Sequence, residues 1–423
     1  TPPQLQNMNT HLGENAELGS DIDFGGSPFN GIGGTHSGTF DGNNLAIRNF
    51  TMNLAGSTRG LFRQVNNITI IRNLKVEGVS INLTGYRSAC VVGYSLVGAN
   101  LTIDNVHVKD CSITTGHASA GETGALLGRT RNGGAITVIQ NSSATNVTID
   151  SKDNIGGLIG YAEGGTAATV SVTNSFVNGG TVTGRTSVGG LIGTSQLNTA
   201  VFSNSYAAVD VTGSNGNIGG FAGQIRGALT DIYATGTVNR TGGNQVGGLI
   251  GYFITGTSTL TGTSAAATRP SGVAAPQTCF ASGTVNGGNA VYVGGLIGRN
   301  NADLIQSCYA TGTVNGGGSQ AGGLIGQTIG DIIDDSFATG VVTGTGDYLG
   351  GLVGYMTNGG QEITNSYATG NVTTNGLSPE YIGGLVGRFR GTVRAQNVYS
   401  TGNVSALSGD GSGNIRYIGG LIG

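Results

Sequence analysis

Three aspartates in one short segment are the side chains best placed for acid–base chemistry. Asp331, Asp334 and Asp335 lie within five positions of one another, and clustered carboxylates are what a polysaccharide hydrolase built on a β-helix would use. No histidine or lysine lies near them in the sequence. Aspartate is also a common turn residue, because its side chain hydrogen-bonds nearby backbone groups. We therefore interpret the cluster as a turn and predict no catalytic residue.

The four histidines do not form a recognisable metal site. His11, His36, His107 and His117 are scattered, and none belongs to a His-Glu-x-x-His motif, the zinc-binding pattern of many metalloproteases. The Gly-Gly-x-Gly-x-Asp repeat of calcium-binding β-rolls is also absent from the sequence. We predict no metal and no cofactor.

The four cysteines could form two disulfides. Cys279 and Cys308 precede the aromatic residue of two successive repeats, so stacking of the repeats would bring them about 5 Å apart, within reach of a disulfide. Cys90 and Cys111 lie within one repeat interval and could also pair. The alternative is that all four are small buried side chains. A disulfide would favour export from the cell, and neither pair has the spacing of a zinc site.

The composition indicates what kind of scaffold carries these residues. Of 423 residues, 82 are glycine and 6 are proline, and the 37% hydrophobic residues come in short runs of valine, isoleucine and leucine. Glycine does not recur at every third position, which excludes collagen, and the apolar content is too high for a disordered chain. A net charge of −3 without a basic stripe argues against a nucleic-acid partner, and no apolar run is long enough to insert into a membrane. A repetitive β architecture is the class that remains.

Two sequence elements alternate along most of the chain. The first is the hexapeptide Val/Ile-Gly-Gly-Leu-Ile-Gly, of which close or looser copies end at Gly93, Gly128, Gly160, Gly193, Gly223, Gly251, Gly298, Gly326, Gly354, Gly387 and Gly423. The second reads Asn/Thr-Ser/Cys-Tyr/Phe-Ala and places an aromatic residue at Phe176, Tyr206, Tyr233, Phe280, Tyr309, Phe337, Tyr367 and Tyr399. Successive hexapeptides are 28 to 36 residues apart, except for one interval of 47 that contains the Ser/Thr/Ala-rich tract Thr255–Gln277. This period indicates stacked repeats, and the tract indicates an inserted loop.

The recurrence predicts an all-β fold, a parallel β-solenoid (β-helix) of about eleven to twelve coils with an N-terminal cap. Each repeat offers roughly three extended runs of about 4 to 8 residues, and each run would pair with its equivalent in the next coil, about 4.8 Å away. Residues 1–60 fit the repeat poorly and are interpreted as the cap and first coil. Residues 61–423 are interpreted as the solenoid, with the inserted loop at about 255–277.

The glycine pair of each hexapeptide is expected at a tight corner of its coil. Such a corner needs either a positive φ or a close approach of two backbones, and glycine permits both. The corner glycines predicted in this way are Gly156, Gly157, Gly189, Gly190, Gly247, Gly248, Gly294, Gly295, Gly322 and Gly323.

The second element places small residues on one side of a strand and aromatic residues on the other, because side chains alternate along a strand. Ile232 and Val398 stand where other repeats have serine, which favours burial of the small side, but an aromatic core stays an alternative. Hydroxyl pairs such as those of Thr311–Thr313 could form the flat array of an ice-binding solenoid. Val341 and Asn371 interrupt that array, so ice binding is not the favoured function.

The hexapeptides, together with the run Gly38–Phe50 that precedes them, resemble the GLUG motif and the segment that opens GLUG arrays in bacterial surface and secreted proteins. The resemblance covers roughly residues 20–423. Proteins with this motif include adhesin-like surface proteins and the N-terminal regions of some immunoglobulin A peptidases. The resemblance implies a β-helical stalk at the surface or outside of a prokaryotic cell, and it supplies no catalytic residues.

We therefore expect a non-enzymatic stalk, adhesin or filament subunit. Its expected partners are a second copy, joined end to end, or a surface glycan or protein receptor. The alternatives are a secreted polysaccharide-active enzyme on a β-helix scaffold and an ice-binding solenoid. The chain begins at Thr1 without a signal segment and stops inside a repeat at Gly423, so we also expect it to be a segment of a longer protein.

Overall fold

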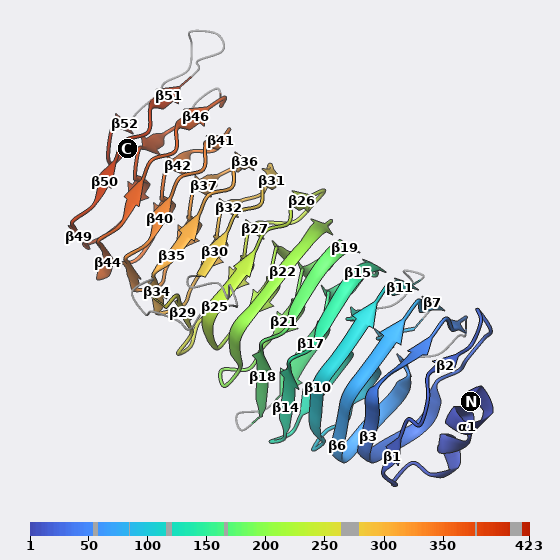
Figure 1. Ribbon diagram of the computed structural model, residues 1–423. Helices are drawn as coiled ribbons and strands as arrows, with labels where there is room; N and C mark the ends of the chain where they lie inside the picture. Colours follow the sequence, from blue (N-terminus) through green and yellow to red (C-terminus); the bar gives the residue numbers. More distant parts are fainter. Residues whose placement is uncertain are drawn as a thin grey trace, which may run out of the picture. The chain divides into compact units, whose positions relative to one another are not determined.

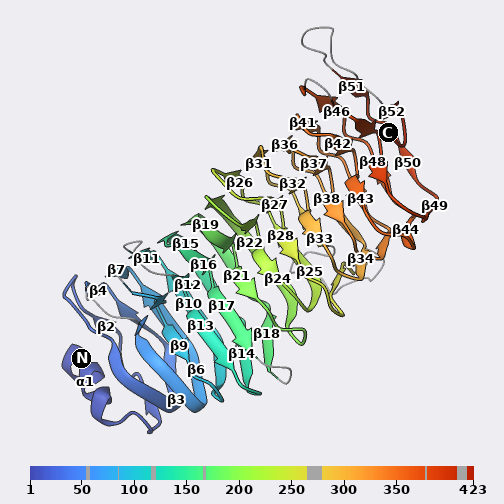
Figure 2. The same ribbon diagram turned by 180° about the vertical axis from the view of Figure 1, so that it is seen from behind.

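Parallel β-strands stacked in turns make up both parts of this chain. The computed structural model describes residues 1–53, 58–83, 85–115, 121–164, 168–263, 279–376, 379–406 and 417–423. The chain divides into two compact units, Thr1–Val209 and Asp210–Gly423. Within each unit the strands of successive turns lie side by side (Figure 1, Figure 2). The turns number about eleven in all, which confirms the predicted parallel β-solenoid.

The first unit opens with a short helix and continues in strands. Its helical elements are α1 (Pro2–Asn7) and η1 (Met8–Thr10). Its strands are β1 (Ala16–Glu17), β2 (Ile22–Asp23), β3 (Ile32–Arg48), β4 (Thr51–Met52), β5 (Thr58–Arg59), β6 (Phe62–Glu77), β7 (Ser80–Leu83), β8 (Arg87–Ser88), β9 (Val92–Ser95), β10 (Asn100–Lys109), β11 (Ser112–Thr115), β12 (Glu122–Thr123), β13 (Leu127–Asn132), β14 (Ile136–Gln140), β15 (Ser143–Asp150), β16 (Asp153–Gly156), β17 (Ile159–Gly164), β18 (Thr169–Thr173), β19 (Phe176–Gly184), β20 (Thr186–Gly189) and β21 (Ile192–Ser195). The next strand, β22 (Val201–Gly213), contains the boundary between the units.

The second unit consists of shorter strands. They are β23 (Asn217–Gly219), β24 (Ala222–Ile225), β25 (Ala228–Ala234), β26 (Val238–Arg240), β27 (Gln245–Gly247), β28 (Ile250–Phe253), β29 (Thr259–Thr261), β30 (Cys279–Ala281), β31 (Val285–Gly288), β32 (Tyr292–Gly294), β33 (Ile297–Asn300), β34 (Leu304–Gln306), β35 (Cys308–Ala310), β36 (Val314–Gly316), β37 (Gln320–Gly322), β38 (Ile325–Thr328), β39 (Ile332–Asp334), β40 (Phe337–Ala338), β41 (Val342–Gly344), β42 (Tyr348–Gly350), β43 (Val353–Met356), β44 (Gln361–Thr364), β45 (Tyr367–Ala368), β46 (Val372–Thr374), β47 (Tyr381–Gly383), β48 (Val386–Phe389), β49 (Val393–Gln396), β50 (Tyr399–Ser400), β51 (Val404–Ala406) and β52 (Tyr417–Gly419). In the described part of the chain, no helix is long and apolar enough to cross a membrane.

One turn of the second unit contains five short strands, where the sequence predicts roughly three runs. The turn from β32 to β36 pairs strand by strand, in parallel, with the turn from β37 to β41. Equivalent residues lie opposite one another, as Ile297 does with Ile325. The additional strands arise because bends between the runs divide them, whereas the ladder between turns continues on both sides of each bend.

The first unit takes the same path with longer strands. The first half of β10 pairs with β14 and its second half pairs with β15. Asn105 lies between the two halves with a left-handed φ of 53°, a conformation that asparagine tolerates better than most residues. A single strand can therefore turn a corner of the solenoid.

Leucine and isoleucine columns fill the interior. Leu296 and Ile297 of one hexapeptide, and Leu324 and Ile325 of the next, are 0% exposed. Full burial of one such side chain contributes about 1.5–3 kcal/mol relative to exposure. Each added turn therefore brings its own share of the core.

The N-terminal segment closes the first unit, and the regular ladder begins before residue 60. Rings of Phe24, Phe29 and Phe50 pack with centroids 4.6–5.7 Å apart. Behind them β3 already pairs in parallel with β6. Residues 1–60 thus contain both a small closing segment, with α1 at the N-terminal end (Figure 1), and a first coil.

Part of the tract predicted as an insertion belongs to the solenoid. Residues Thr259–Thr261 form β29, which pairs with β25 and β34 and belongs to the solenoid. The bend before β29 is short. The remainder of the predicted loop, from residue 264 onward, lies outside the described residues.

Close contact between successive turns is what requires glycine at the corners. The alternative reason, a positive φ at these glycines, is wrong. None of the ten predicted corner glycines has a positive φ. A Cβ placed on Gly157, Gly248, Gly295 or Gly323 would lie 2.0–2.2 Å from a carbonyl oxygen of the following turn, closer than real Cβ atoms approach. Any side chain at these corners would therefore push two turns apart.

Candidate functional site

The aspartate cluster forms part of a turn. Asp335 has a left-handed φ of 45°, as expected for a turn residue. The Asp334 carboxylate accepts hydrogen bonds from Gln306 Nε2 at 3.0 Å, Thr364 Oγ1 at 2.6 Å and Asn365 Nδ2 at 3.0 Å. Burial raises the pKa of Asp334, but these hydrogen bonds outweigh burial and leave its pKa below the ordinary value. A carboxylate held ionised in this way is poorly suited to act as a general acid.

Asparagine side chains form ladders along the corners, a feature that the sequence analysis missed. Asn105 Nδ2 donates to Asn73 Oδ1 at 2.9 Å in the first unit, and Asn397 Nδ2 donates to Asn365 Oδ1 at 3.0 Å in the second. All four residues have left-handed φ values. Their recurrence just before the Ser/Cys position is the signal that could have identified them.

The histidines lie apart from one another. His36 is 0% exposed and packs against Phe62, and burial lowers its pKa. His107 lies within hydrogen-bonding distance of Ser143 Oγ, at 2.9 Å, and burial also lowers its pKa. His11 pairs with an exposed glutamate, and His117 lies outside the described residues. In the described part of the chain, no group of three or more His, Cys, Asp or Glu side chains could hold a metal ion.

The two cysteine pairs differ. Cys90 and Cys111 form a disulfide. Cys279 and Cys308 lie opposite each other on β30 and β35, as expected from their positions in the repeat, but both are free buried thiols. Cys308 Sγ donates to the backbone oxygen of Gln306 at 3.1 Å, and burial raises its pKa well above the usual value. Both thiols therefore behave as members of the small buried column.

Serine and cysteine occupy the interior side of the second repeat element, and the aromatic residues occupy the outer side. Ser336 Oγ accepts from the backbone N–H of Cys308 at 3.2 Å and donates to the backbone oxygen of Asp334 at 2.8 Å. Ser336 and Ser366 are buried, whereas the neighbouring aromatic rings are partly exposed. The alternative of an aromatic core is therefore wrong.

The aromatic residues stack along each unit. In the second unit, centroids of successive rings from Tyr233 to Tyr399 are 4.7–5.0 Å apart, with interplanar angles of 1–7°. In the first unit, Phe176 and Tyr206 stack at 4.9 Å. Because neighbouring rings cover one another's faces, this column presents ring edges to solvent. Rings inside the column therefore offer no open face on which a sugar could stack, whereas the end ring Tyr399, which is 49% exposed, has a stacked neighbour on one side in the described structure.

The threonine column does not form a flat array. Thr311, Gly312 and Thr313 lie between β35 and β36, at a bend of the turn. The equivalent Val341 is 38% exposed and interrupts the hydroxyl groups. Hydroxyls at bends lack the regular plane that an ice-binding face needs.

A charged cluster covers the hexapeptide side of the first unit. Glu122 accepts from Arg87 Nε at 3.0 Å and from Arg129 Nη1 at 2.6 Å, and Arg129 also bonds Glu163. Glu122 is 8% exposed, and burial raises its pKa despite the two arginines. Arg131 also lies 3.5 Å from Glu163, so every guanidinium of the cluster has a carboxylate partner and the cluster holds successive turns together.

The same side of the second unit carries a different set of residues. The residues that flank each hexapeptide lie on β32, β37, β42 and β47 and on β33, β38, β43 and β48, several of which Figure 2 shows side by side. The strand register aligns them in two columns. The eight residues are Tyr292, Gln320, Tyr348 and Tyr381 in one column and Arg299, Gln327, Tyr355 and Arg388 in the other. We call this surface the tyrosine–arginine face.

Both arginines of this face rest against tyrosine rings. The guanidinium carbon of Arg299 is 5.5 Å from the ring centre of Tyr292. That of Arg388 is 4.5 Å from Tyr381, and its Nη1 donates to Tyr348 Oη at 3.1 Å. Among the described residues, no carboxylate pairs with either arginine.

Two glutamines lie between the arginines in the columns. Gln320 and Gln327 belong to one turn and are 7% and 8% exposed. Oε1 of Gln320 and Oε1 of Gln327 have no hydrogen-bond partner in the described structure. Nε of Arg299 also has no hydrogen-bond partner there. The face therefore combines two unpaired cations with two unsatisfied acceptors.

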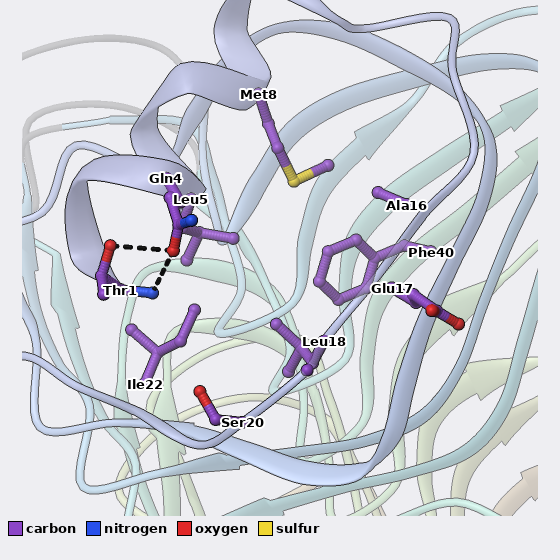
Figure 3. A pocket seen from close by; sticks show the side chains of 11 residues that line it. Thr1, Gln4, Leu5, Met8, Ala16, Glu17, Leu18, Ser20, Ile22 and Phe40 are labelled. Atoms are coloured by element: carbon purple, nitrogen blue, oxygen red, sulfur yellow. Dashed lines mark hydrogen bonds between the residues drawn. The ribbon is translucent and has the colours of Figure 1, made fainter.

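A small cavity lies at the N-terminal end of the first unit. It has a volume of about 320 Å³ and lies between α1 and the first strands. Figure 3 shows Met8, Leu18, Ile22 and Phe40 around a common space, with Glu17 at its side. Its lining combines these apolar side chains with the polar residues Thr1, Gln4, Glu17 and Ser20.

Comparison with known proteins identifies a described motif in two of the repeats. The model of the GLUG motif matches residues 289–315 and 345–373, stretches that include the hexapeptides and flanking residues of two turns. No curated protein sequence matches the chain. A crystal structure from Bacteroides ovatus, whose description proposes an immunoglobulin A1 protease, is 17% identical over 93% of this chain and 82% of that one, with a TM-score of 0.28. That TM-score establishes no shared activity. This chain is therefore a parallel β-solenoid that carries repeats matching the GLUG motif.

Proposed function

We propose that this chain is a non-catalytic structural and adhesive β-solenoid that acts outside a prokaryotic cell, as a stalk or adhesin. The observation that carries the proposal is how polar side chains are used. Polar side chains of the repeats bond to the equivalent position in a neighbouring turn, as Asn397 does with Asn365 and Ser336 with Cys308. Such bonds stiffen a stack of turns and leave few groups free for chemistry.

The disulfide supports a location outside the cytoplasm. Disulfides such as Cys90–Cys111 persist in oxidising compartments and are rare in the cytosol of most organisms. A surface role also agrees with the type of protein in which the motif occurs.

Binding without turnover is the behaviour that tests this proposal. Purified protein is incubated with bacterial cells and with a panel of surface polysaccharides, and retained protein and newly released reducing ends are measured. We expect retention and no release. Release by the wild-type chain that is lost in Asp334→Asn would overturn the non-catalytic assignment in favour of a polysaccharide-active enzyme.

Assembly can be observed on the same material. Negative-stain electron microscopy distinguishes discrete particles, expected for a stalk or adhesin, from filaments. Filaments would replace the stalk or adhesin assignment with that of a polymerising subunit.

A further inference from the structure

Arg299 and Arg388 of the second unit have no carboxylate partner among the described residues. At the equivalent place in the first unit, Arg129 pairs with Glu122 and Glu163. Arg299 and Arg388 lie against tyrosine rings, as Arg129 does against Tyr161, but they lack the carboxylates. Cation–π contact with a ring holds a guanidinium in position without cancelling its charge. The second unit therefore presents ordered positive charge.

We propose that the tyrosine–arginine face binds an acidic polysaccharide, a sugar chain that carries carboxylate or sulfate groups. This inference rests on the proposed adhesive function and names the ligand class and the site for it. Guanidinium groups bind carboxylate and sulfate oxygens through two parallel hydrogen bonds, which makes arginine a selective residue for such anions.

The spacing of the arginines favours a polymer with recurring charge. Arg299 and Arg388 are separated by three steps of the same column, through Gln327 and Tyr355. At about 4.8 Å per step the separation is about 14 Å. One small anion cannot reach both, whereas a chain with charges on several of its sugars can.

The glutamines favour a ligand that also carries hydroxyl groups. Gln320 Oε1 and Gln327 Oε1 are buried acceptors without partners, and a buried polar atom without a partner carries a free-energy cost. Neither atom is accessible to solvent as the side chains lie, so a sugar hydroxyl can donate to each only after the glutamine side chain rotates outward. Hydroxyl donors and anions along one chain are the defining chemistry of acidic polysaccharides.

The face lacks the features by which proteins usually bind peptides. Added strands need a free sheet edge and helical peptides need an apolar groove. Here β37 and β38 are paired on both sides, to β32 and β42 and to β33 and β43. Side chains alone are available for contact.

Two acidic residues limit where the sugar chain can lie. Asp347 and Glu380 come directly before Tyr348 and Tyr381 in the sequence. Burial and the nearby Glu380 raise the pKa of Asp347. Their negative charge would repel an anion at that edge, so the chain is expected to follow the column that contains Arg299 and Arg388.

Polymers with the same backbone and different charge test the inference on the wild-type protein. Biolayer interferometry compares polygalacturonate with its methyl ester, and dextran sulfate with dextran. We expect binding to one or both charged forms, with the two pairs separating carboxylate from sulfate, and no binding to the neutral forms. Binding should weaken steeply from about 0.01 M to about 1 M salt, because the Debye length shortens from about 30 Å to about 3 Å. Equal binding of charged and neutral forms would overturn the inference.

Arginine variants locate the site. The double variant Arg299→Gln, Arg388→Gln should weaken binding of the preferred polymer at least about ten-fold, since it removes two charged donors. Arg394→Gln is the matched control, because Arg394 lies on β49, is 67% exposed and pairs with Glu362. Its Kd should stay within about two-fold of wild type. Wild-type affinity in the double variant would refute the site.

Further outcomes separate this inference from the proposed function. Poly-glutamate that binds as tightly as the polysaccharide, and depends on the same arginines, would identify an acidic peptide as the ligand and overturn the glycan assignment. A double variant that attaches to cells as well as the wild-type protein does would refute the proposed binding site but leave the proposed adhesive function intact. Wild-type protein that attaches to no cell and no glycan would overturn both. If the double variant does not fold, as judged by circular dichroism, the comparison of charged and neutral polymers on wild type still decides.

Discussion

A methyl group placed at Gly295 tests whether contact between turns is what requires glycine at the corners. A Cβ there would lie 2.0 Å from the carbonyl oxygen of Gly323 and 3.0 Å from Cβ of Ala310. Real Cβ atoms do not approach heavy atoms closer than about 3.0 Å, so the two turns must separate locally by about 1 Å. Gly295 does not have a positive φ, so Gly295→Ala adds no backbone strain.

The separation would break hydrogen bonds at this corner. Leu296 N and Ile297 N both donate to the oxygen of Leu324, at 2.9 and 3.0 Å, and an added ångström takes both beyond hydrogen-bonding range. Loss of two bonds costs about 1 kcal/mol each and overpacking costs about 1–3 kcal/mol. The smaller entropy of the unfolded alanine chain recovers about 0.4–1 kcal/mol. We expect Gly295→Ala to lower the free energy of unfolding by about 2–5 kcal/mol.

Gly420→Ala is the matched control. Gly420 is the second glycine of the last hexapeptide, and a Cβ there meets nothing within 4 Å. Urea unfolding is followed by tyrosine fluorescence, since the chain has no tryptophan. Gly295→Ala should lower the midpoint at an unchanged m-value, and Gly420→Ala should change the free energy of unfolding by less than about 1 kcal/mol. Equal stabilities of the two variants would refute the contact explanation.

Three other changes test the cysteines, the buried histidine and the stacked rings. Cys90→Ser removes a disulfide across a sequence separation of 21 and should lower the free energy of unfolding by about 3 kcal/mol. In urea unfolding, reductant should destabilise the wild-type protein by a similar amount and leave the stability of the variant unchanged. A reductant effect on the variant would contradict this explanation. Burial lowers the pKa of His36, so as pH falls below about 6.5 the unfolded chain takes up its proton first and the free energy of unfolding decreases. In urea unfolding between about pH 7 and pH 5.5, His36→Phe should reduce this slope, with a remainder from His107, whose pKa burial also lowers; an unchanged slope would exclude His36. Tyr309→Ala removes two stacked contacts and Tyr399→Ala removes one. Each ring contact contributes about 0.5–1.5 kcal/mol in addition to the buried area. In thermal or urea unfolding, the stacking part of the loss in free energy of unfolding should therefore be about twice as large for Tyr309→Ala as for Tyr399→Ala. Equal losses would show that stacking does not stabilise the column.

The solenoid was predictable because its signal is recurrence. Hexapeptides at a nearly constant interval require each turn to present the same leucine and isoleucine side chains to the same interior. The number of strands in a turn was less predictable. Corners occur where residues such as Asn105 and Asn365 adopt a left-handed φ, and the amide bonds that favour this conformation exist between turns. Within the sequence of a single repeat, the only sign of those bonds is one asparagine, which does not by itself predict a corner.

The candidate site was harder to predict from the sequence than the fold. Reasoning from spacing treated Cys279 with Cys308 and Cys90 with Cys111 as two possible disulfides, and one of the two pairs remains as free thiols. The tyrosine–arginine face was missed although its signal is simple, a pair of residues seven apart that flank each hexapeptide, as in Tyr292 and Arg299. These flanking residues vary from repeat to repeat, so they do not stand out in a search for recurring residues.

The amino-acid sequence alone determined the class of this protein, the alternation of its two repeat elements and the positions of its corner glycines. These follow from local chemistry and period, which are visible in one dimension. The tertiary structure decided which side of the aromatic strand is buried, why the corner glycines are needed, and that Arg299 and Arg388 lie unpaired beside tyrosines while Arg129 is ion-paired. Each of these depends on what the next turn places opposite a residue. That neighbour is about 30 positions away in the chain and about 4.8 Å away in space, so stacking of the turns decides it.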